Sequence, residues 1–482
     1  MEEIKNFIGG EFMPAVSGKW LSKECPATGK PYAKIPDSDT RDVEAAVRAA
    51  RSAFPAWSAM PARERAKALR RLAILIEAHC AELAQAESID SGKPLRVATQ
   101  VDIPRSAYNF EFFADALTQF SSECHVTDGT AINYTVRSPL GVVGCISPWN
   151  LPLYLLTWKI APALAAGNTV VAKPSEVTPM TAFLLARLVQ EAEIPPGVLN
   201  IVHGTGAQAG DALVSHPEIA AISFTGSTRT GEHIARVTAP KFKKVSLEMG
   251  GKNPTIIFAD CDFEAALDGA LRAAFSNQGQ ICLCGSRIFV ERPIYEKFKQ
   301  ALVDRTRGLK LGDPLEEAVD QGALVSRDHM EKVLSYISIA KEEGGKIIVG
   351  GSRARLTGRC ERGYFVEPTI IEGLPSSSRI NQEEIFGPVA TLIPFDRESE
   401  VLEWANSTRY GLAASVWTQD LGRAHRVAGL LESGIVWVNC WMLRDLRTPF
   451  GGVKDSGVGR EGGLEALRFF TEPKNICIRV GQ

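Results

Sequence analysis

An excess of charge of either sign is missing from this sequence. Its 482 residues include 54 lysines and arginines against 56 aspartates and glutamates, a formal net charge of -2, and neither sign forms long blocks. A nucleic-acid-binding protein needs a basic patch or stripe for the phosphates, so this balance argues against a nucleic-acid partner. We therefore expect a small-molecule partner.

Long hydrophobic runs are also missing. The most apolar region, 142–166, is interrupted at Pro148, Asn150, Pro152, Lys159 and Pro162. A membrane-spanning helix needs about 20 uninterrupted apolar residues, so this region is expected to be buried interior. The opening residues MEEIKN lack the apolar core and the cleavage site of a secretory signal. We expect a cytoplasmic protein with no membrane partner.

Clustered metal ligands are the third absence. The ten cysteines are scattered without a repeated C-x-x-C spacing, and there are only seven histidines. Cys282 and Cys284 could form a redox pair or half of a metal site, but no second cluster of Cys or His completes a ligand set. We expect reduced thiols and no metal.

The composition is that of an ordinary globular protein, with 45% hydrophobic and 23% charged residues, and the length allows roughly three domains of about 150 residues. Segments 43–53 and 62–89 show the apolar periodicity of amphipathic helices. Short apolar runs then alternate with helical stretches, which favours a parallel sheet with crossover helices. The predicted strands of this first series are 142–146, 169–173, 198–202, 220–224 and 244–247.

A second series of strands and helices follows residue 251 and predicts another α/β domain. Its predicted strands are 253–258, 286–291, 363–371 and 435–439. Segments 123–136 and 475–480 also look extended but stand apart from both series. Because isolated strands often pair with another subunit, we expect a homodimer or homotetramer.

A thiol and a carboxylate indicate covalent catalysis. Cys282 follows the small polar loop Ser276-Asn277-Gln278-Gly279-Gln280, about thirty residues after Glu248. A cysteine nucleophile needs a polarised setting, and a thioester needs a base that delivers water. Either residue alone is more often structural, a buried thiol or a solvated charge, so the pair by itself is a weak indication.

Nucleotide-binding features accompany the first predicted sheet. Lys173 and Glu176 lie at the carboxyl end of a predicted strand, where doubly wound sheets bind ligands, and Glu176 could accept hydrogen bonds from ribose hydroxyls and repel a 2′-phosphate. Two glycine-rich turns lie nearby, one around Gly206 and Gly210 and one at Phe224-Thr225-Gly226-Ser227. Neither matches G-x-G-x-x-G, and glycine also simply closes turns, so each turn alone is a weak indication.

Seven motifs occur together in one order along the chain. They are Ser147-Pro148-Trp149-Asn150, Lys173-Pro174-Ser175-Glu176, Phe224-Thr225-Gly226-Ser227, Glu248-Met249-Gly250-Gly251-Lys252, the Cys282 loop, Glu383-Glu384-Ile385-Phe386-Gly387-Pro388 and Pro449-Phe450-Gly451-Gly452. In this combination the chain resembles the aldehyde dehydrogenase superfamily, over nearly its whole length from Asn6 to Thr471.

The resemblance implies an α/β fold with two doubly wound parallel-sheet domains and a small β oligomerisation hairpin. It implies a Rossmann-like NAD-binding domain at 1–122 and 141–250, a catalytic domain at 251–452, and oligomerisation segments at 123–140 and 453–482.

The resemblance also implies a reaction and a cofactor, NAD. Cys282 would attack the aldehyde, Asn150 and the Cys282 backbone N–H would hold the oxyanion, and Glu248 would activate the water that releases the acid. The family register selects Cys282 over Cys284 as the nucleophile. Lys173 and Glu176 would hold the adenosine ribose and Glu384 the nicotinamide ribose. The other implied cofactor-binding residues are Trp149, Gly206, Gly210, Phe224, Gly226, Ser227 and Phe386.

One branch of the superfamily, the 2-aminomuconic semialdehyde dehydrogenases of tryptophan catabolism (the kynurenine pathway), is especially similar. The similar segments are 102–106, 146–158, 280–284 and 439–444. In that branch two arginines grip the substrate carboxylate, and Arg105 and Arg444 stand at the matching positions. 2-Hydroxymuconic semialdehyde fits this reading equally well, and retinal or a general aldehyde is a further alternative.

Two other classes of protein remain to be weighed. A hydrolytic or acyl-transferring cysteine enzyme would explain Cys282 and Glu248 but leave the nucleotide-site residues without a purpose. A structural protein recruited from this fold would usually have lost a catalytic residue, and Cys282, Glu248 and Asn150 are all present.

Overall fold

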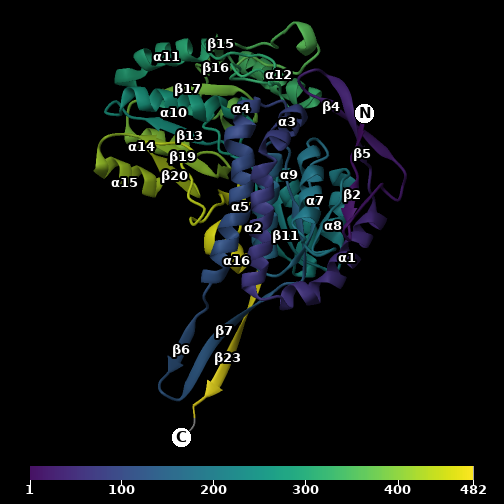
Figure 1. Cartoon of the computed structure of the whole chain (residues 1–482). Coiled ribbons are helices and arrows are strands. Elements are labelled where there is room, and N and C mark those ends of the chain that lie inside the picture. The colour runs from purple at the N-terminus through teal and green to yellow at the C-terminus, as the bar shows by residue number, and fades with distance from the viewer. Residues whose placement is uncertain (481–482) are drawn as a thin grey trace.

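Two mixed, mainly parallel sheets with helices packed on them form the body of the protein, and a β arm projects from it (Figure 1). This computed structural model describes residues 1–480. The predicted α/β class is confirmed by the sheets themselves and by the structural relatives reported below.

The first sheet has eight strands in the order β22-β12-β11-β8-β9-β10-β2-β3. The central five strands are parallel, and β2 and β22 join its two sides antiparallel. The strands are β8 (Val142–Ile146), β9 (Thr169–Lys173), β10 (Leu199–Ile201), β11 (Ile219–Thr225), β12 (Lys244–Glu248), β22 (Gly457–Val458), β2 (Asn6–Ile8) and β3 (Glu11–Met13). All five strands predicted for the first series are present.

Burial on both faces explains why these strands read as continuous apolar runs. Alternate residues of β8 enter different cores: Val143 packs in the core with α2, α5, α6 and α7, whereas Val142 packs in the core with α1, α8 and α9. These helices are α1 (Thr40–Ala59), α2 (Ala62–Ala78), α5 (Ile103–Gln119), α6 (Pro152–Ala165), α7 (Met180–Glu191), α8 (Asp211–Ser215) and α9 (Thr228–Thr238).

The helix predicted at 62–89 is two helices. Helix α2 ends at Ala78, and α3 (Cys80–Ser91) begins after the single cap residue His79. No glycine or proline marks this break, so the apolar periodicity alone predicts one continuous helix. The short α4 (Leu95–Val97) and a π-helix at Ala98–Asp102 then lead into α5.

The second sheet has seven strands in the order β15-β16-β17-β14-β13-β19-β20, parallel except for β15. The strands are β13 (Pro254–Ile257), β14 (Arg287–Glu291), β15 (Lys346–Val349), β16 (Thr369–Glu372), β17 (Val389–Phe395), β19 (Ala413–Trp417) and β20 (Ile435–Val438). Its helices are α10 (Phe263–Phe275), α11 (Arg292–Arg307), α12 (Arg327–Glu342), α13 (Arg379–Gln382), α14 (Glu398–Asn406) and α15 (Leu421–Leu430).

The strand predicted at 363–371 is wrong over 363–368, because β16 begins only at Thr369. Residues before it bond elsewhere: Tyr364 donates its N–H to Pro26 and accepts one from Leu324. Small sheets complete the body, formed by β1 (Glu2–Glu3), β4 (Trp20–Cys25) and β5 (Lys30–Pro36), and by β18 (Tyr410–Gly411) with β21 (Val453–Lys454).

The projecting arm is a three-stranded antiparallel sheet in the order β23-β7-β6, seen below the body in Figure 1. Its strands are β6 (Cys124–Thr127), β7 (Ala131–Pro139) and β23 (Thr471–Arg479). The extended segments predicted at 123–136 and 475–480 therefore pair with each other within the chain.

Only part of 453–482 belongs to this arm. Strand β22 lies in the first sheet, α16 (Gly463–Phe469) packs on α6, and residues 481–482 fall outside the described residues. The division into nucleotide, catalytic and oligomerisation parts stays a prediction. In residues 1–480, no helix is long and apolar enough to cross a bilayer.

Candidate active site

A cleft opens at the carboxyl ends of the parallel strands of the first sheet. Strands β9 and β11 flank β8 on opposite sides, so the chain leaves β8 and β11 toward different faces of the sheet. Open α/β sheets bind ligands at the crevice between two such strands. Two adjoining cavities of about 250 and 260 Å³ occupy this position. Both are lined by Pro148, Trp149, Thr225, Gly226 and Ser227, so they form one continuous cleft.

The outer cavity contains the residues predicted for the adenosine end of the cofactor. Lys173 Nζ lies 2.8 Å from Glu176 Oε2, and the Gly206 N–H points at Glu176 Oε1 from 3.4 Å. Burial favours the neutral acid, but the Lys173 charge and hydrogen bond outweigh it and hold the pKa of Glu176 below its usual value. Glu176 is therefore an ionised acceptor near neutral pH. Gly210 and Phe224 line the same cavity.

A helix start and a crowded glycine shape the wall between the two cavities. Ser227 caps α9 by accepting a hydrogen bond from the Thr230 N–H at 3.2 Å, so the amino end of this helix faces the cleft. Amino ends of helices favour anions such as phosphate. At Gly226 a Cβ atom would lie 2.4 Å from the ring of Phe224, so only glycine fits.

Aromatic residues line the inner cavity. The ring of Trp149 meets those of Phe386 and His329 edge-on, with centroids 5.2 and 5.0 Å away. Phe386 has a left-handed backbone, φ 60°, and its carbonyl lies 2.6 Å from His329 Nε2. Burial lowers the pKa of His329 to about 4, so the neutral ring donates from Nε2. His329 was not predicted from the sequence.

Glu384 reaches this cavity from the loop before β17. Its Oε1 accepts the Gly251 N–H at 3.0 Å, and a Cβ on Gly250 would lie 2.1 Å from its Oε2. The paired glycines of the Glu248-Met249-Gly250-Gly251 motif therefore leave room for this carboxylate. Lys332 of α12, also not predicted, lines the cavity beside it and donates to the Glu384 carbonyl at 3.3 Å.

Cys282 is presented at the inner end by a tightly wound loop. Asn277, Gln278 and Gly279 all have left-handed backbones, with φ of 50, 55 and 69°, and a Cβ on Gly279 would lie 2.0 Å from the Gly387 carbonyl. The side chain of Cys282 is partly exposed and lines the cavity, whereas Cys284 is buried in the core.

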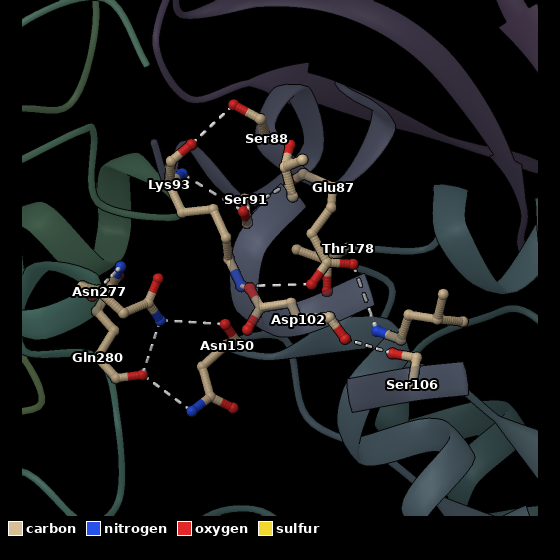
Figure 2. Close-up of polar contacts among 12 residues, drawn as sticks. Glu87, Ser88, Ser91, Lys93, Asp102, Ser106, Asn150, Thr178, Asn277 and Gln280 are labelled. Atoms are coloured by element: carbon tan, nitrogen blue, oxygen red, sulfur yellow. Dashed lines mark hydrogen bonds and ion pairs between the residues drawn. The ribbon is translucent and has the colours of Figure 1, made fainter. Parts of the chain in front are cut away.

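Asn150 lies directly against the Cys282 loop, as Figure 2 shows. Its Nδ2 donates to the Gln280 carbonyl at 2.9 Å, and its own carbonyl accepts from Asn277 Nδ2 at 3.1 Å. The backbone N–H of Cys282 makes no hydrogen bond among residues 1–480. Two donors, this N–H and the second hydrogen of the Asn150 amide, therefore remain available beside the sulfur.

Glu248 ends strand β12 and is buried, and neither of its carboxyl oxygens has a hydrogen-bond partner among the described residues 1–480. Burial, and then the charge of Glu461, raise its pKa well above the usual value. Glu461 in turn lies 2.6 Å from Lys159 Nζ and accepts from Ser223 Oγ at 3.2 Å. The buried Lys159 and Glu461 were not predicted, and they place an ion pair behind Glu248.

The electrostatics of the free protein keep the sulfur protonated. Burial, followed by the charges of Glu384 and Glu248, raises the pKa of Cys282 to about 12. The positive charge of Arg444 acts in the opposite direction and also lowers the pKa of Glu248. Arg444 is therefore close enough to act on both groups.

Arg105 and Arg444 lie together over one indole ring. Their guanidinium carbons lie 5.5 and 6.0 Å from the centroid of Trp158, and Arg444 also lies 4.2 Å from that of Phe450. Neither arginine has an ion-pair partner within residues 1–480, and the Arg444 charge contributes to lowering the pKa of Arg105, after burial. Two neighbouring cations without a counter-charge suit an anionic ligand.

A buried charged cluster supports this side of the site (Figure 2). Lys93 Nζ lies 2.5 Å from Asp102 and 3.3 Å from Glu87, and Glu87 also accepts the Leu153 N–H at 3.4 Å. Burial raises the pKa of Glu87 to about 7, although Lys93 opposes the shift. The cluster ties the π-helix before α5 to the first turn of α6. No group of three or more metal-ligating side chains occurs in residues 1–480.

Comparison with known proteins gives one consistent result. Residues 12–476 match the model of the aldehyde dehydrogenase family. The 2-aminomuconic semialdehyde dehydrogenase of Danio rerio is 54% identical over 99% of this chain and 98% of its own length, and the 2-hydroxymuconic semialdehyde dehydrogenase of Pseudomonas sp. (strain CF600) is 50% identical over 100% of both. The NAD⁺ complex of an aldehyde dehydrogenase from Bacillus cereus superposes with a TM-score of 0.97 at 45% identity, covering 100% of this chain and 97% of that one.

Proposed function

The chain belongs to the aldehyde dehydrogenase family and is an oxidoreductase acting on aldehydes, and from this premise we propose that it oxidises 2-aminomuconic semialdehyde to 2-aminomuconate with NAD, a step of tryptophan catabolism. The observation that carries the substrate proposal is the pair Arg105 and Arg444, two cations without a counter-charge whose nearer member acts on Cys282. A substrate carboxylate would supply the missing negative charge while the aldehyde at the other end reaches the sulfur.

Cys282 forms the covalent bond in this proposal. Its sulfur adds to the aldehyde carbon as the thiol proton passes to solvent, and the carbonyl oxygen takes up the negative charge. The Asn150 amide and the Cys282 N–H would stabilise that oxygen, because both lie beside the sulfur with hydrogens to donate. When bound, NAD supplies the acceptor for the hydride, and loss of hydride from the carbon leaves a thioester on Cys282.

Glu248 would release the acid. Once ionised, its carboxylate takes a proton from water, the water oxygen bonds to the thioester carbon, and the carbon–sulfur bond breaks. The support is that neither carboxyl oxygen of Glu248 is engaged and that its charge acts on Cys282. A base with a raised pKa is also better matched to neutral pH than an ordinary glutamate.

The cleft fits NAD rather than NADP. Glu176 is held as an anion by Lys173, so it can accept from ribose hydroxyls and would repel a 2′-phosphate. The start of α9 at Ser227 suits a pyrophosphate, and Glu384 would bond the nicotinamide ribose. Trp149 and Phe386 would enclose the nicotinamide end.

The second candidate substrate is 2-hydroxymuconic semialdehyde, favoured by the relative from Pseudomonas sp. (strain CF600). Both semialdehydes offer the same carboxylate to the two arginines. Their ranking depends on the neighbouring amino or hydroxyl group.

One kinetic comparison tests the proposal. We would measure kcat/KM from NADH absorbance for both muconic semialdehydes, for retinal and for a neutral aliphatic aldehyde, each with NAD and with NADP. The proposal requires the acid-bearing semialdehydes with NAD to give the largest values. Equal kcat/KM for the neutral aldehyde would remove the basis for the carboxylate site, and a larger value with NADP would contradict the assignment of Glu176.

The oligomer and the location are also proposals. The edge strand β6 is exposed along its whole length, with Val126 71% exposed, so the arm offers an unpaired strand to a second copy in a homodimer or homotetramer. Deleting the tip of the arm should lower the mass in solution, and an unchanged mass would contradict this. All ten cysteines are free, in accord with the reducing cytoplasm.

A further inference from the structure

Arg105 is oriented by a single buried amide. Its Nε–H donates to Oδ1 of Asn109, one turn further along α5, at 3.1 Å. Asn109 is completely buried. A long arginine side chain has many rotamers, so a fixed partner on Nε removes rotation of the guanidinium plane about the side chain.

The Asn109 amide is itself locked in one orientation. Its Nδ2 donates to the Tyr154 carbonyl at 3.1 Å and to Thr157 Oγ1 at 3.0 Å. Thr157 gives its own hydrogen to the Tyr154 carbonyl at 3.0 Å, so it can only accept from Asn109. Both amide hydrogens are therefore used on α6, and the carbonyl oxygen must face Arg105.

The far edge of the guanidinium is left without a partner. Arg105 Nη2 is buried and makes no hydrogen bond to any of residues 1–480, while the guanidinium stacks on Tyr154 and Trp158 at 5.1 and 5.5 Å. Buried donors of charged groups are rarely left unpaired, because the lost solvation is costly. An orphaned buried donor beside the second cation, Arg444, indicates a place reserved for a ligand oxygen.

We propose that Asn109 is a positioning residue for substrate recognition: by fixing Arg105 through Nε, it holds the Nη2 edge ready to bond the carboxylate of the aldehyde substrate. This inference rests on the proposed function, since it assumes that the arginine pair binds that carboxylate. It adds that selectivity for acid-bearing aldehydes depends on a side chain that touches neither the substrate nor the reacting atoms.

The test compares Asn109→Ser with Asn168→Ser. Asn168 is equally buried, but its amide bonds to Leu140, Ala163 and Phe470, away from the arginines. The readout is the ratio of kcat/KM for a muconic semialdehyde to kcat/KM for a neutral aldehyde, each with NAD. A role in folding alone lowers both values together and leaves the ratio unchanged.

We expect Asn109→Ser to lower this ratio about tenfold through KM, as for one weakened bond to a charged group, and Asn168→Ser to leave it unchanged. Asn109→Asp keeps the size of the side chain and pairs a carboxylate with Arg105, so it should lower the ratio further. If Asn109→Ser does not fold, Asn109→Asp takes its place in the comparison. The inhibition constant of hexanoate, measured against oxidation of the neutral aldehyde, is then a second measure of carboxylate binding.

The outcomes separate two failures. If the wild type shows no preference for the acid-bearing aldehyde, or Arg105→Met leaves the preference intact, the proposed function is wrong. If Arg105→Met abolishes the preference while both Asn109 variants retain it, the carboxylate site stands and the positioning role of Asn109 is wrong.

Discussion

Replacing Arg444 by methionine tests the two effects expected of its single positive charge. Within residues 1–480 the side chain makes no hydrogen bond or ion pair, and it lies over Trp158 and Phe450, so methionine keeps the apolar contact and removes only the cation. A charged hydrogen bond to a carboxylate contributes about 1.5–3 kcal/mol, so kcat/KM for an acid-bearing semialdehyde should fall about 10- to 150-fold.

A second effect of the same substitution follows from the position of Arg444 near Cys282 and Glu248. Arg444 lowers the pKa of both Cys282 and Glu248, so its removal raises both values. Glu248 then ionises at higher pH, and the rising limb of kcat against pH that reports this base should move upward. This shift should also occur with a neutral aldehyde, which separates it from the loss of carboxylate binding.

The assay is NADH formation by Arg444→Met, with an acid-bearing and a neutral aldehyde, across about pH 6 to about pH 9. The matched control is Arg447→Met, three residues away, whose side chain is 80% exposed and pairs with Asp445. The reasoning is refuted if Arg444→Met keeps wild-type kcat/KM for the acid-bearing substrate, or if Arg447→Met loses as much.

Four other predictions concern different parts of the site. Glu248→Gln should give one NADH per site in a stopped-flow burst and then turn over about 10²- to 10⁴-fold more slowly, since only the base is lost; steady wild-type turnover would contradict this. Gly250→Ala should raise the KM for NAD, because the added Cβ would lie 2.1 Å from Glu384 Oε2 and displace that carboxylate. An unchanged KM would show that the carboxylate is not needed there. Glu176→Gln should lower the preference for NAD over NADP, measured as a ratio of kcat/KM, by about tenfold or more; an unchanged ratio would contradict the charge argument. Lys93→Met should cost about 3–5 kcal/mol in denaturant unfolding, because it leaves two buried carboxyl groups without their cation; a loss below about 1 kcal/mol would show that the cluster adjusts by taking up protons.

Strands at the centre of the first sheet could be predicted to the residue. Segments 142–146 and 169–173 coincide with β8 and β9, because both are buried on two faces and follow glycine-containing turns at Gly141 and Gly167. Strands β17 and β19 were missed although they are just as buried. β17 contains a proline, which argues against a strand interior, and β19 opens with two alanines and a serine, which lack the β-branched enrichment of a strand.

The residues of the sequence motifs lie together in the structure, because glycines and charged residues at strand ends reflect local backbone needs. Every residue predicted to bind cofactor lines one of the two adjoining cavities. The residues that were missed come from elsewhere. His329 and Lys332 lie on an amphipathic helix, and nothing in its sequence pattern distinguishes their face from an ordinary solvent-exposed face. Lys159 and Glu461 form an ion pair although they are 302 residues apart in the sequence, so no spacing rule predicts their contact.

Peptide mapping of the trapped intermediate tests the central claim most directly. The Glu248→Gln protein would be mixed with NAD and an acid-bearing semialdehyde, quenched in acid, digested and analysed by mass spectrometry. The account predicts an acyl group, the substrate less its transferred hydride, in place of the thiol hydrogen of Cys282 and on no other cysteine. An unmodified Cys282 after the NADH burst, or acylation at Cys284 instead, would contradict it.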